Sequence, residues 1–164
     1  MNEGRIQAAF EEGTFVLKLS GDVRLTLCAT LDQQVEPLAE LPGLERVIVD
    51  LREVINMDST ALGFLAKIAL AVRERLPNQP LVVVEHPDVL QMLEVMGFQH
   101  YVTIVEAPGP EPDRFDELPT MESGEEELRA RILEAHRTLM QMSEHNRLEF
   151  QPLVELLESQ HQNH

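Results

Sequence analysis

Two short aliphatic runs that flank a stretch of helical periodicity constrain the fold of this chain more than any other feature. The runs are 47–49 (Val-Ile-Val) and 81–84 (Leu-Val-Val-Val), and such continuous runs are typical of strands that helices cover. Between them, the apolar residues of 59–76 recur at spacings of three and four: Leu62, Leu65, Ile68, Ala69 and Val72. We therefore expect two central strands joined by a crossover helix, which places the chain in the α/β class.

The neighbouring segments extend this pattern in both directions. Residues 6–10 and 15–19 predict a hairpin toward one edge of the sheet, because a turn at 11–14 joins two runs with strand character. A helix is expected over 31–41, just before Pro42 and Gly43. An apolar stripe over 89–96 predicts a further helix that stops at Gly97, and a short last strand follows near 102–105.

An acidic, proline-rich segment then divides the chain. Residues 106–127 carry nine acidic residues and one basic residue, and four prolines lie in the same stretch. Such a composition can neither continue a helix nor bury much apolar surface. We therefore predict a domain over 1–106, a linker over 107–124 and a C-terminal helical hairpin or extension over 125–160.

The predicted C-terminal helical hairpin has apolar residues at intervals of four and three: Leu128, Ile132, Ala135, Leu139 and Met142. Asn146 interrupts this stripe, and Pro152 fits the first turn of a second, short helix. The apolar face is too narrow to form a core alone, so it must dock on the first domain, on another chain or on a partner.

Composition narrows the functional classes. The formal net charge of −16, from 29 acidic and 13 basic residues among 164, repels nucleic acid and anionic lipid headgroups. The single Cys28 cannot form an intramolecular disulfide, and no apolar signal core follows Met1, so we expect a cytoplasmic protein. The longest nearly apolar run, 62–72, is interrupted by Lys67 and is too short to insert into a membrane.

The strongest functional signal is a group of polar residues, Asp58, Ser59 and Thr60, expected after a buried strand and a short loop, where the crossover helix begins. Helix capping alone explains such residues, because their side-chain oxygens accept the free N–H groups of the first turn. The alternative is phosphorylation of Ser59, since the helix dipole tolerates a phosphate there while a docked partner would meet new charge and bulk. On this hypothesis the Ser59 hydroxyl is exposed.

These residues resemble the sulfate transporter and anti-sigma factor antagonist (STAS) domain, particularly its bacterial anti-anti-sigma members. The resemblance covers about residues 5–106 and rests on four segments: 19–23 (Leu-Ser-Gly-Asp-Val), 47–51 (Val-Ile-Val-Asp-Leu), 57–63 (Met-Asp-Ser-Thr-Ala-Leu-Gly) and 90–98 (Leu-Gln-Met-Leu-Glu-Val-Met-Gly-Phe). It implies a STAS-like mixed β-sheet of four to five strands with helices. The helical tail is unusual for the family and is similar to that of HsbA-type regulators.

In that family the unmodified domain binds an anti-sigma factor and so releases a sigma factor. The resemblance implies that a serine kinase inactivates this chain at Ser59 and that a PP2C-like phosphatase restores it. The expected partner-binding residues are Asp22, Asp58, Ser59, Thr60 and Leu62. The chain departs from the family pattern at Arg24, where many relatives carry an acid, and at Ala61, where glycine is frequent.

Other functions are less well supported by the sequence. The six histidines have no spacing typical of a metal site, so we expect them to be solvated and expect no metal or other cofactor. The residues around Ser59 do not form a Gly-x-Ser-x-Gly elbow, so we expect no enzyme. The alternative function is an accessory subunit of a membrane transport complex, as some STAS proteins are. The C-terminal helices are candidates for a homodimer contact or a second partner contact.

Overall fold

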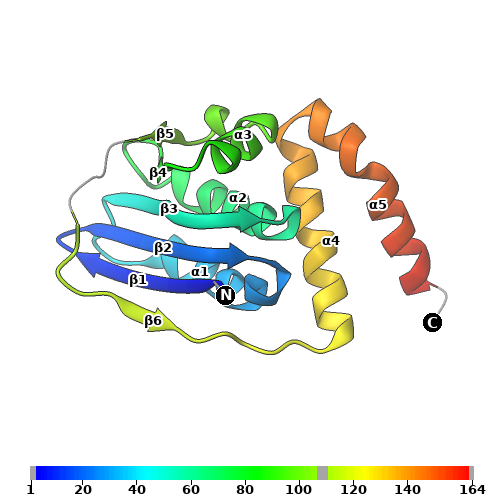
Figure 1. Ribbon diagram of the computed structural model, residues 1–164, viewed down its shortest axis with the longest axis horizontal. Helices are drawn as coiled ribbons and strands as arrows, with labels where there is room; N and C mark the ends of the chain where they lie inside the picture. The colour runs from blue at the N-terminus through cyan, green and yellow to red at the C-terminus, as the bar shows by residue number, and fades with distance from the viewer. Residues whose placement is uncertain (1–2, 107–110, 163–164) are drawn as a thin grey trace.

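The protein folds into one mixed sheet with helices packed on one face. A C-terminal helical hairpin lies at one end of the sheet. The computed structural model describes residues 3–106 and 111–162 (Figure 1). The strands are β1 (Arg5–Glu11), β2 (Thr14–Val23), β3 (Arg46–Met57), β4 (Leu81–Val83), β5 (Thr103–Val105) and β6 (Asp116–Leu118). The helices are α1 (Cys28–Glu40), α2 (Ser59–Arg73), α3 (Pro87–Val95), α4 (Glu125–Met142) and α5 (Glu144–Gln162), with 3-10 turns η1 (Leu25–Leu27) and η2 (Phe98–His100).

The sheet has the strand order β5-β4-β3-β2-β1-β6, so β3 and β4 are interior strands as predicted. β1 and β2 form the expected antiparallel hairpin, whereas β2, β3, β4 and β5 run parallel to one another. The α/β class is therefore confirmed, with six strands instead of four to five. The additional strand, β6, comes from the segment predicted to be a linker.

The helices α1 and α2 lie behind the sheet in Figure 1, and α3 packs into the same core through Val89 and Leu93. The face that they cover holds this main core, in which Leu17, Leu51 and Phe64 are fully buried. The other face has a smaller apolar cluster of Val16, Ile48 and Val83, against which Phe115 packs. Because aliphatic side chains are covered on both faces of β3 and β4, their sequences read as continuous apolar runs.

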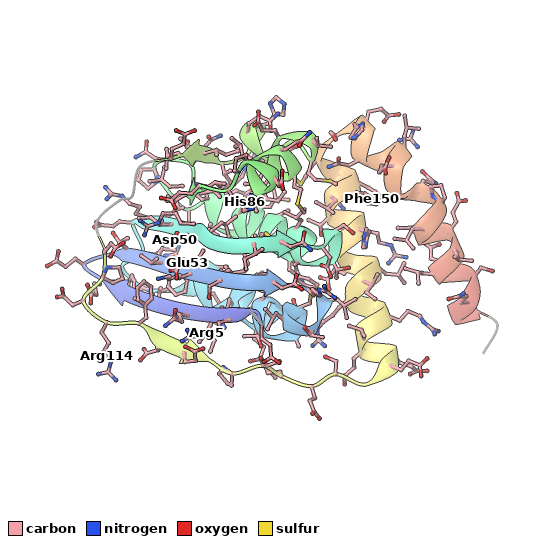
Figure 2. All side chains as sticks on the ribbon, in the orientation of Figure 1. Arg5, Asp50, Glu53, His86, Arg114 and Phe150 are labelled. Atoms are coloured by element: carbon pink, nitrogen blue, oxygen red, sulfur yellow. The ribbon has the colours of Figure 1, made fainter. Side chains whose placement is uncertain are left out.

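Strand β3 continues to Met57, which corrects the prediction of a short loop before Asp58. Pairing with β2 persists to Val23 and Met57 because two register shifts absorb the irregular stretch. The polar residues in the second half of β3 lie on the face that no helix covers, where Figure 2 labels Asp50 and Glu53. Helix α1 also differs from prediction, since it begins at Cys28, three residues before Leu31.

Within the predicted linker, residues 107–110 lie outside the described residues. Residues 116–118 form β6, which pairs antiparallel with β1 through Ile6 and Leu118. Further along, the Thr30 hydroxyl of α1 donates a hydrogen bond to the Pro119 carbonyl at 2.8 Å. The segment therefore follows the edge of the sheet on its way to α4 (Figure 1).

The C-terminal hairpin consists of α4 and α5, and its apolar face docks on the first domain. Helix α4 packs against α2, and α5 lies along the outer side of α4 (Figure 1). Helix α5 begins at Glu144, so Pro152 lies inside it and not in its first turn as predicted. At the start of α5 the Asn146 N–H donates a hydrogen bond to Ser143 Oγ at 3.1 Å, and the fully buried Asn146 side chain donates to the carbonyls of Met96 and Leu139 at 2.8 and 2.9 Å.

Candidate functional site

Asp58 closes the junction between β3 and α2. Its extended backbone precedes the helix, and its Oδ1 accepts a hydrogen bond from the Ala61 N–H at 2.8 Å, as a helix cap does. Its Oδ2 accepts from the Leu25 N–H at 2.7 Å, and its own N–H donates to the Val23 carbonyl at 3.2 Å. Asp58 thus fixes the start of α2 to the end of β2. Helix capping accounts for its contact with Ala61 without any ligand.

Ser59, the first residue of α2, meets a side chain from the far end of the sequence. Its Oγ lies 2.8 Å from Nε2 of His136 in α4. Ser59 is half-buried. The structure therefore corrects the expectation that this hydroxyl is exposed, because α4 packs over the start of α2.

His136 is 2% exposed, so the expectation of solvated histidines is wrong for this residue, whereas His100 and His145 are exposed. Its Nδ1 lies 2.7 Å from the Ile132 carbonyl, which can only accept, so Nδ1 carries the proton. Burial lowers the pKa of His136, although the Ile132 hydrogen bond and the charge of Asp58 raise it. In the neutral ring Nε2 is therefore an acceptor, and the Ser59 hydroxyl donates to it.

The other predicted partner-binding residues lie in different environments. The Asp22 carboxylate is partly exposed and pairs with Arg24 Nε at 2.6 Å, close to the η1 turn. Thr60 and Leu62 are 5% and 1% exposed, and Leu62 belongs to the main core. The structure thus brings Asp58 and Ser59 together at a partly accessible junction, whereas Thr60 and Leu62 support α2 from the interior.

The arrangement positions the Ser59 hydroxyl against a neutral imidazole. Nδ1 of His136 bonds to its own helix carbonyl, where a catalytic triad places a carboxylate. Two hollows of the described surface are lined by other residues, one near Glu45 and one near Glu53. Among the side chains described in 3–106 and 111–160, no group of three or more His, Cys, Asp or Glu could hold a metal ion.

Sequence reasoning missed two residues of this site. His136 follows Ile132 by four residues, which places it on the apolar face of α4 and was the available signal. The second residue is Lys67, which forms ion pairs with Asp32 at 3.0 Å and with Glu134 of α4. No helix in the described part of the chain has the length and apolar character needed to cross a membrane.

Comparisons with known proteins agree with this architecture. The family model described as "Mlab, STAS domain" matches residues 6–106. Similar solved structures include the unphosphorylated anti-sigma factor antagonist SpoIIAA and an anti-sigma factor antagonist from Mycobacterium paratuberculosis. No curated protein matches significantly.

The two structures are distant from this chain in sequence. SpoIIAA is 13% identical with a TM-score of 0.52, and the match covers 63% of this chain and 89% of that one. The mycobacterial protein is 19% identical with a TM-score of 0.52, and the match covers 64% and 87%. At these identities the likeness establishes the fold of the first domain, and α4 and α5 lie beyond the family match.

Proposed function

Because the chain belongs to the STAS domain family, we propose that it is an anti-sigma factor antagonist whose partner binding is controlled at Ser59. The unphosphorylated chain binds an anti-sigma factor and thereby releases a sigma factor. The observation that carries the proposal is the position of Ser59 as the first residue of α2, directly after the Asp58 cap. The junction around Asp22, Asp58 and Ser59 is the proposed docking surface.

Phosphorylation at this position changes charge at an edge of that surface. Ser59 Oγ attacks the γ-phosphorus of ATP, the bond from phosphorus to the bridging oxygen breaks, ADP leaves, and a base of the kinase takes the hydroxyl proton. A PP2C-like phosphatase reverses the state by directing water at the phosphorus, which restores the serine and releases inorganic phosphate. The chain itself supplies the acceptor oxygen and no catalytic group.

A phosphate at the start of α2 is compatible with a folded domain. It adds about two negative charges, which the N-terminal end of a helix accommodates through its dipole and free N–H groups. Both carboxylate oxygens of Asp58 already accept backbone N–H groups, which lowers the repulsion between that carboxylate and a neighbouring phosphate. A partner docked on this junction would instead meet uncompensated charge, and a coupling of about 3 kcal/mol lowers its affinity more than a hundredfold.

The test compares full-length variants as baits in cells that make the chain naturally. Ser59→Ala should retain an anti-sigma factor, and Ser59→Asp should lose most of it, as quantified by mass spectrometry of the captured proteins. Ser159→Asp is the matched control, because Ser159 is exposed near the end of α5. Equal recovery of the anti-sigma factor with Ser59→Asp and with the wild type would rule out control at Ser59.

The kinase assignment has its own experiment. Incubation with ATP and the serine kinase recovered alongside the chain should place phosphate on Ser59, as mapped by tandem mass spectrometry of the peptide that contains it. Phosphate found on other residues only, or on Ser59→Ala to the same extent, would reject Ser59 as the modified residue.

A second candidate is an accessory subunit of a membrane transport complex that binds its partner without phosphorylation. The observation that favours it is the hydrogen bond between Ser59 and His136, which engages the hydroxyl beneath α4. Recovery of a transporter ATPase and permease, without an anti-sigma factor or a kinase, would support this candidate. The same affinity purification therefore separates the two functions.

A further inference from the structure

Helix α4 occupies the side of α2 that carries Ser59. Three residues of α2, one turn apart, face it: Ser59, Gly63 and Lys67. At the middle position, a Cβ atom added to Gly63 would lie 2.5 Å from the Ala135 carbonyl oxygen and 2.6 Å from the Ala135 Cβ. Only glycine allows the two helix backbones to approach this closely. The start of α2 is therefore a surface shaped for a helix, and the chain fills it with its own α4.

Ion pairs anchor α4 along the same contact. Lys67 Nζ lies 3.0 Å from the Asp32 carboxylate of α1 and also pairs with Glu134 of α4. Arg131 of α4 reaches the same Asp32 at 3.4 Å. The four side chains are partly buried, so salt screens these pairs less than fully exposed ones. They orient α4 across α1 and α2.

The upper end of the hairpin is held through hydrogen bonds. The Tyr101 hydroxyl donates to the Met142 carbonyl at the end of α4, at 3.0 Å. Asn146 connects the start of α5 to the carbonyls at Met96 and Leu139, as described above. These contacts lie beyond α3, at the opposite end of α4 from its junction with the linker. Helix α4 is therefore attached to the first domain along its length, and α5 is attached at its start.

Three contacts hold the buried His136 ring against Ser59. One ring nitrogen is bonded to Ile132 and the other to Ser59, at 2.7 and 2.8 Å. The ring also packs edge-on against Phe150 of α5, with 4.9 Å between the ring centroids. Figure 2 labels Phe150 where α5 lies along α4. A phosphoryl group on Ser59 Oγ would have to occupy the space that this ring fills.

We propose that the α4–α5 hairpin is a built-in competitor for the Ser59 surface, and that a phosphate on Ser59 and a docked partner each require α4 to leave α2. The inference rests on the proposed function, because it specifies how access to the same serine is regulated. In the closed chain His136 engages the half-buried hydroxyl and restricts its access to a kinase, and α4 covers the face beside Gly63 that a partner would need. Phosphorylation of a transiently open chain then prevents the hairpin from closing again.

The test uses the full-length chain with phosphoserine incorporated at position 59 during translation, so it needs no kinase and no partner. Amide hydrogen exchange compares this chain with the unmodified protein and with a chain carrying phosphoserine at Ser159. Amides of α4 should exchange at least about tenfold faster in the chain modified at position 59, which corresponds to a tenfold larger open fraction. Amides of β3 should keep their protection, and the chain modified at Ser159 should behave like the unmodified one.

A second variant isolates the role of the imidazole. In a His136→Ala background the space beside Ser59 is vacant, so phosphoserine at position 59 should accelerate α4 exchange by a smaller factor than in the wild-type background. Equal factors in the two backgrounds would show that the ring is not what excludes the phosphate, and would overturn the inference.

Two further outcomes also overturn it. Unchanged or slower exchange of α4 with phosphoserine at position 59 would mean that the closed hairpin accommodates the phosphate, for instance by pairing it with a protonated His136. Loss of protection in β3 as well as α4 would mean general unfolding and not release of the hairpin. Neither result bears on the anti-sigma factor, whose recovery is measured separately, so failure of this inference and failure of the proposed function are distinguishable.

Discussion

Replacing Gly63 by alanine tests the close packing of α4 on α2, because two effects of this substitution have opposite signs. In a helix that packs against nothing, Gly→Ala stabilises by about 0.5–1 kcal/mol. Here the added Cβ would lie 2.5 Å from the Ala135 carbonyl oxygen, where backbone must move, and overpacking of this kind costs about 1–3 kcal/mol. We expect overpacking to win, with a net loss of about 1–2 kcal/mol.

The assay is thermal unfolding of the full-length chain, combined with amide exchange of α4. For a chain of this size the expected loss lowers the unfolding midpoint by about 2–8 °C, and α4 should lose protection before β3 does. Gly124→Ala is the matched control, because a Cβ there has no neighbour within 4 Å and Gly124 has a negative φ of −68°. Because Gly124 is the N-cap of α4 and glycine is preferred to alanine at such a position, the control should cost no more than about 1 kcal/mol and should leave the protection of α4 beyond its first turn unchanged. A higher midpoint for Gly63→Ala, with α4 protection unchanged, would refute the described packing.

Three further predictions concern buried polar groups. Burial lowers the pKa of His136, although the charge of Asp58 opposes this shift. Below about pH 6.5 the unfolded chain therefore binds a proton more readily than the folded chain, and the free energy of unfolding falls as the pH falls. Urea titrations should show this loss in the wild type but not in His136→Gln, and parallel pH curves for the two proteins would contradict it. Burial raises the pKa of Cys28 to about 12, so a thiol reagent at pH 8 should react slowly with the native chain and fully only after unfolding. Burial opposes ionisation of Asp50, but hydrogen bonds from Arg52 lower its pKa overall. Arg52→Gln removes these bonds and should lower the free energy of unfolding in urea by roughly 2 kcal/mol. Adding Asp50→Asn removes the unpaired buried charge and should recover part of that stability.

Much of the first domain was predictable because its signals are local. The runs at 47–49 and 81–84 are buried on both faces, and that environment selects aliphatic side chains regardless of what lies elsewhere in the chain. The stop at Gly97 was also visible, since that residue adopts φ of 84° after α3. Strand β6 was not predictable, because Asp116, Glu117 and Leu118 have no strand pattern and pair only because β1 offers an edge.

The candidate site was predictable in part for the same reason. Asp58 and Ser59 were found because helix capping acts within three residues. The hydrogen bond from Ser59 to His136 spans 77 positions and depends on how α4 packs on α2. Periodicity identifies the apolar face of α4 but does not say which surface it contacts, so the covered hydroxyl became visible only in the assembled fold.

Strand β6 has a consequence for the behaviour of the protein at high concentration. A long exposed edge such as β1 would be a template for pairing with other chains, which is how many sheet proteins aggregate. Instead, three residues that include two acids cover part of that edge, and Arg5 holds Glu117 there through two hydrogen bonds of 2.9 and 2.8 Å. The opposite edge, β5, is equally short. The segment 107–124, which has the composition of a linker, thus also covers, through β6, a sheet edge at which other chains could otherwise add.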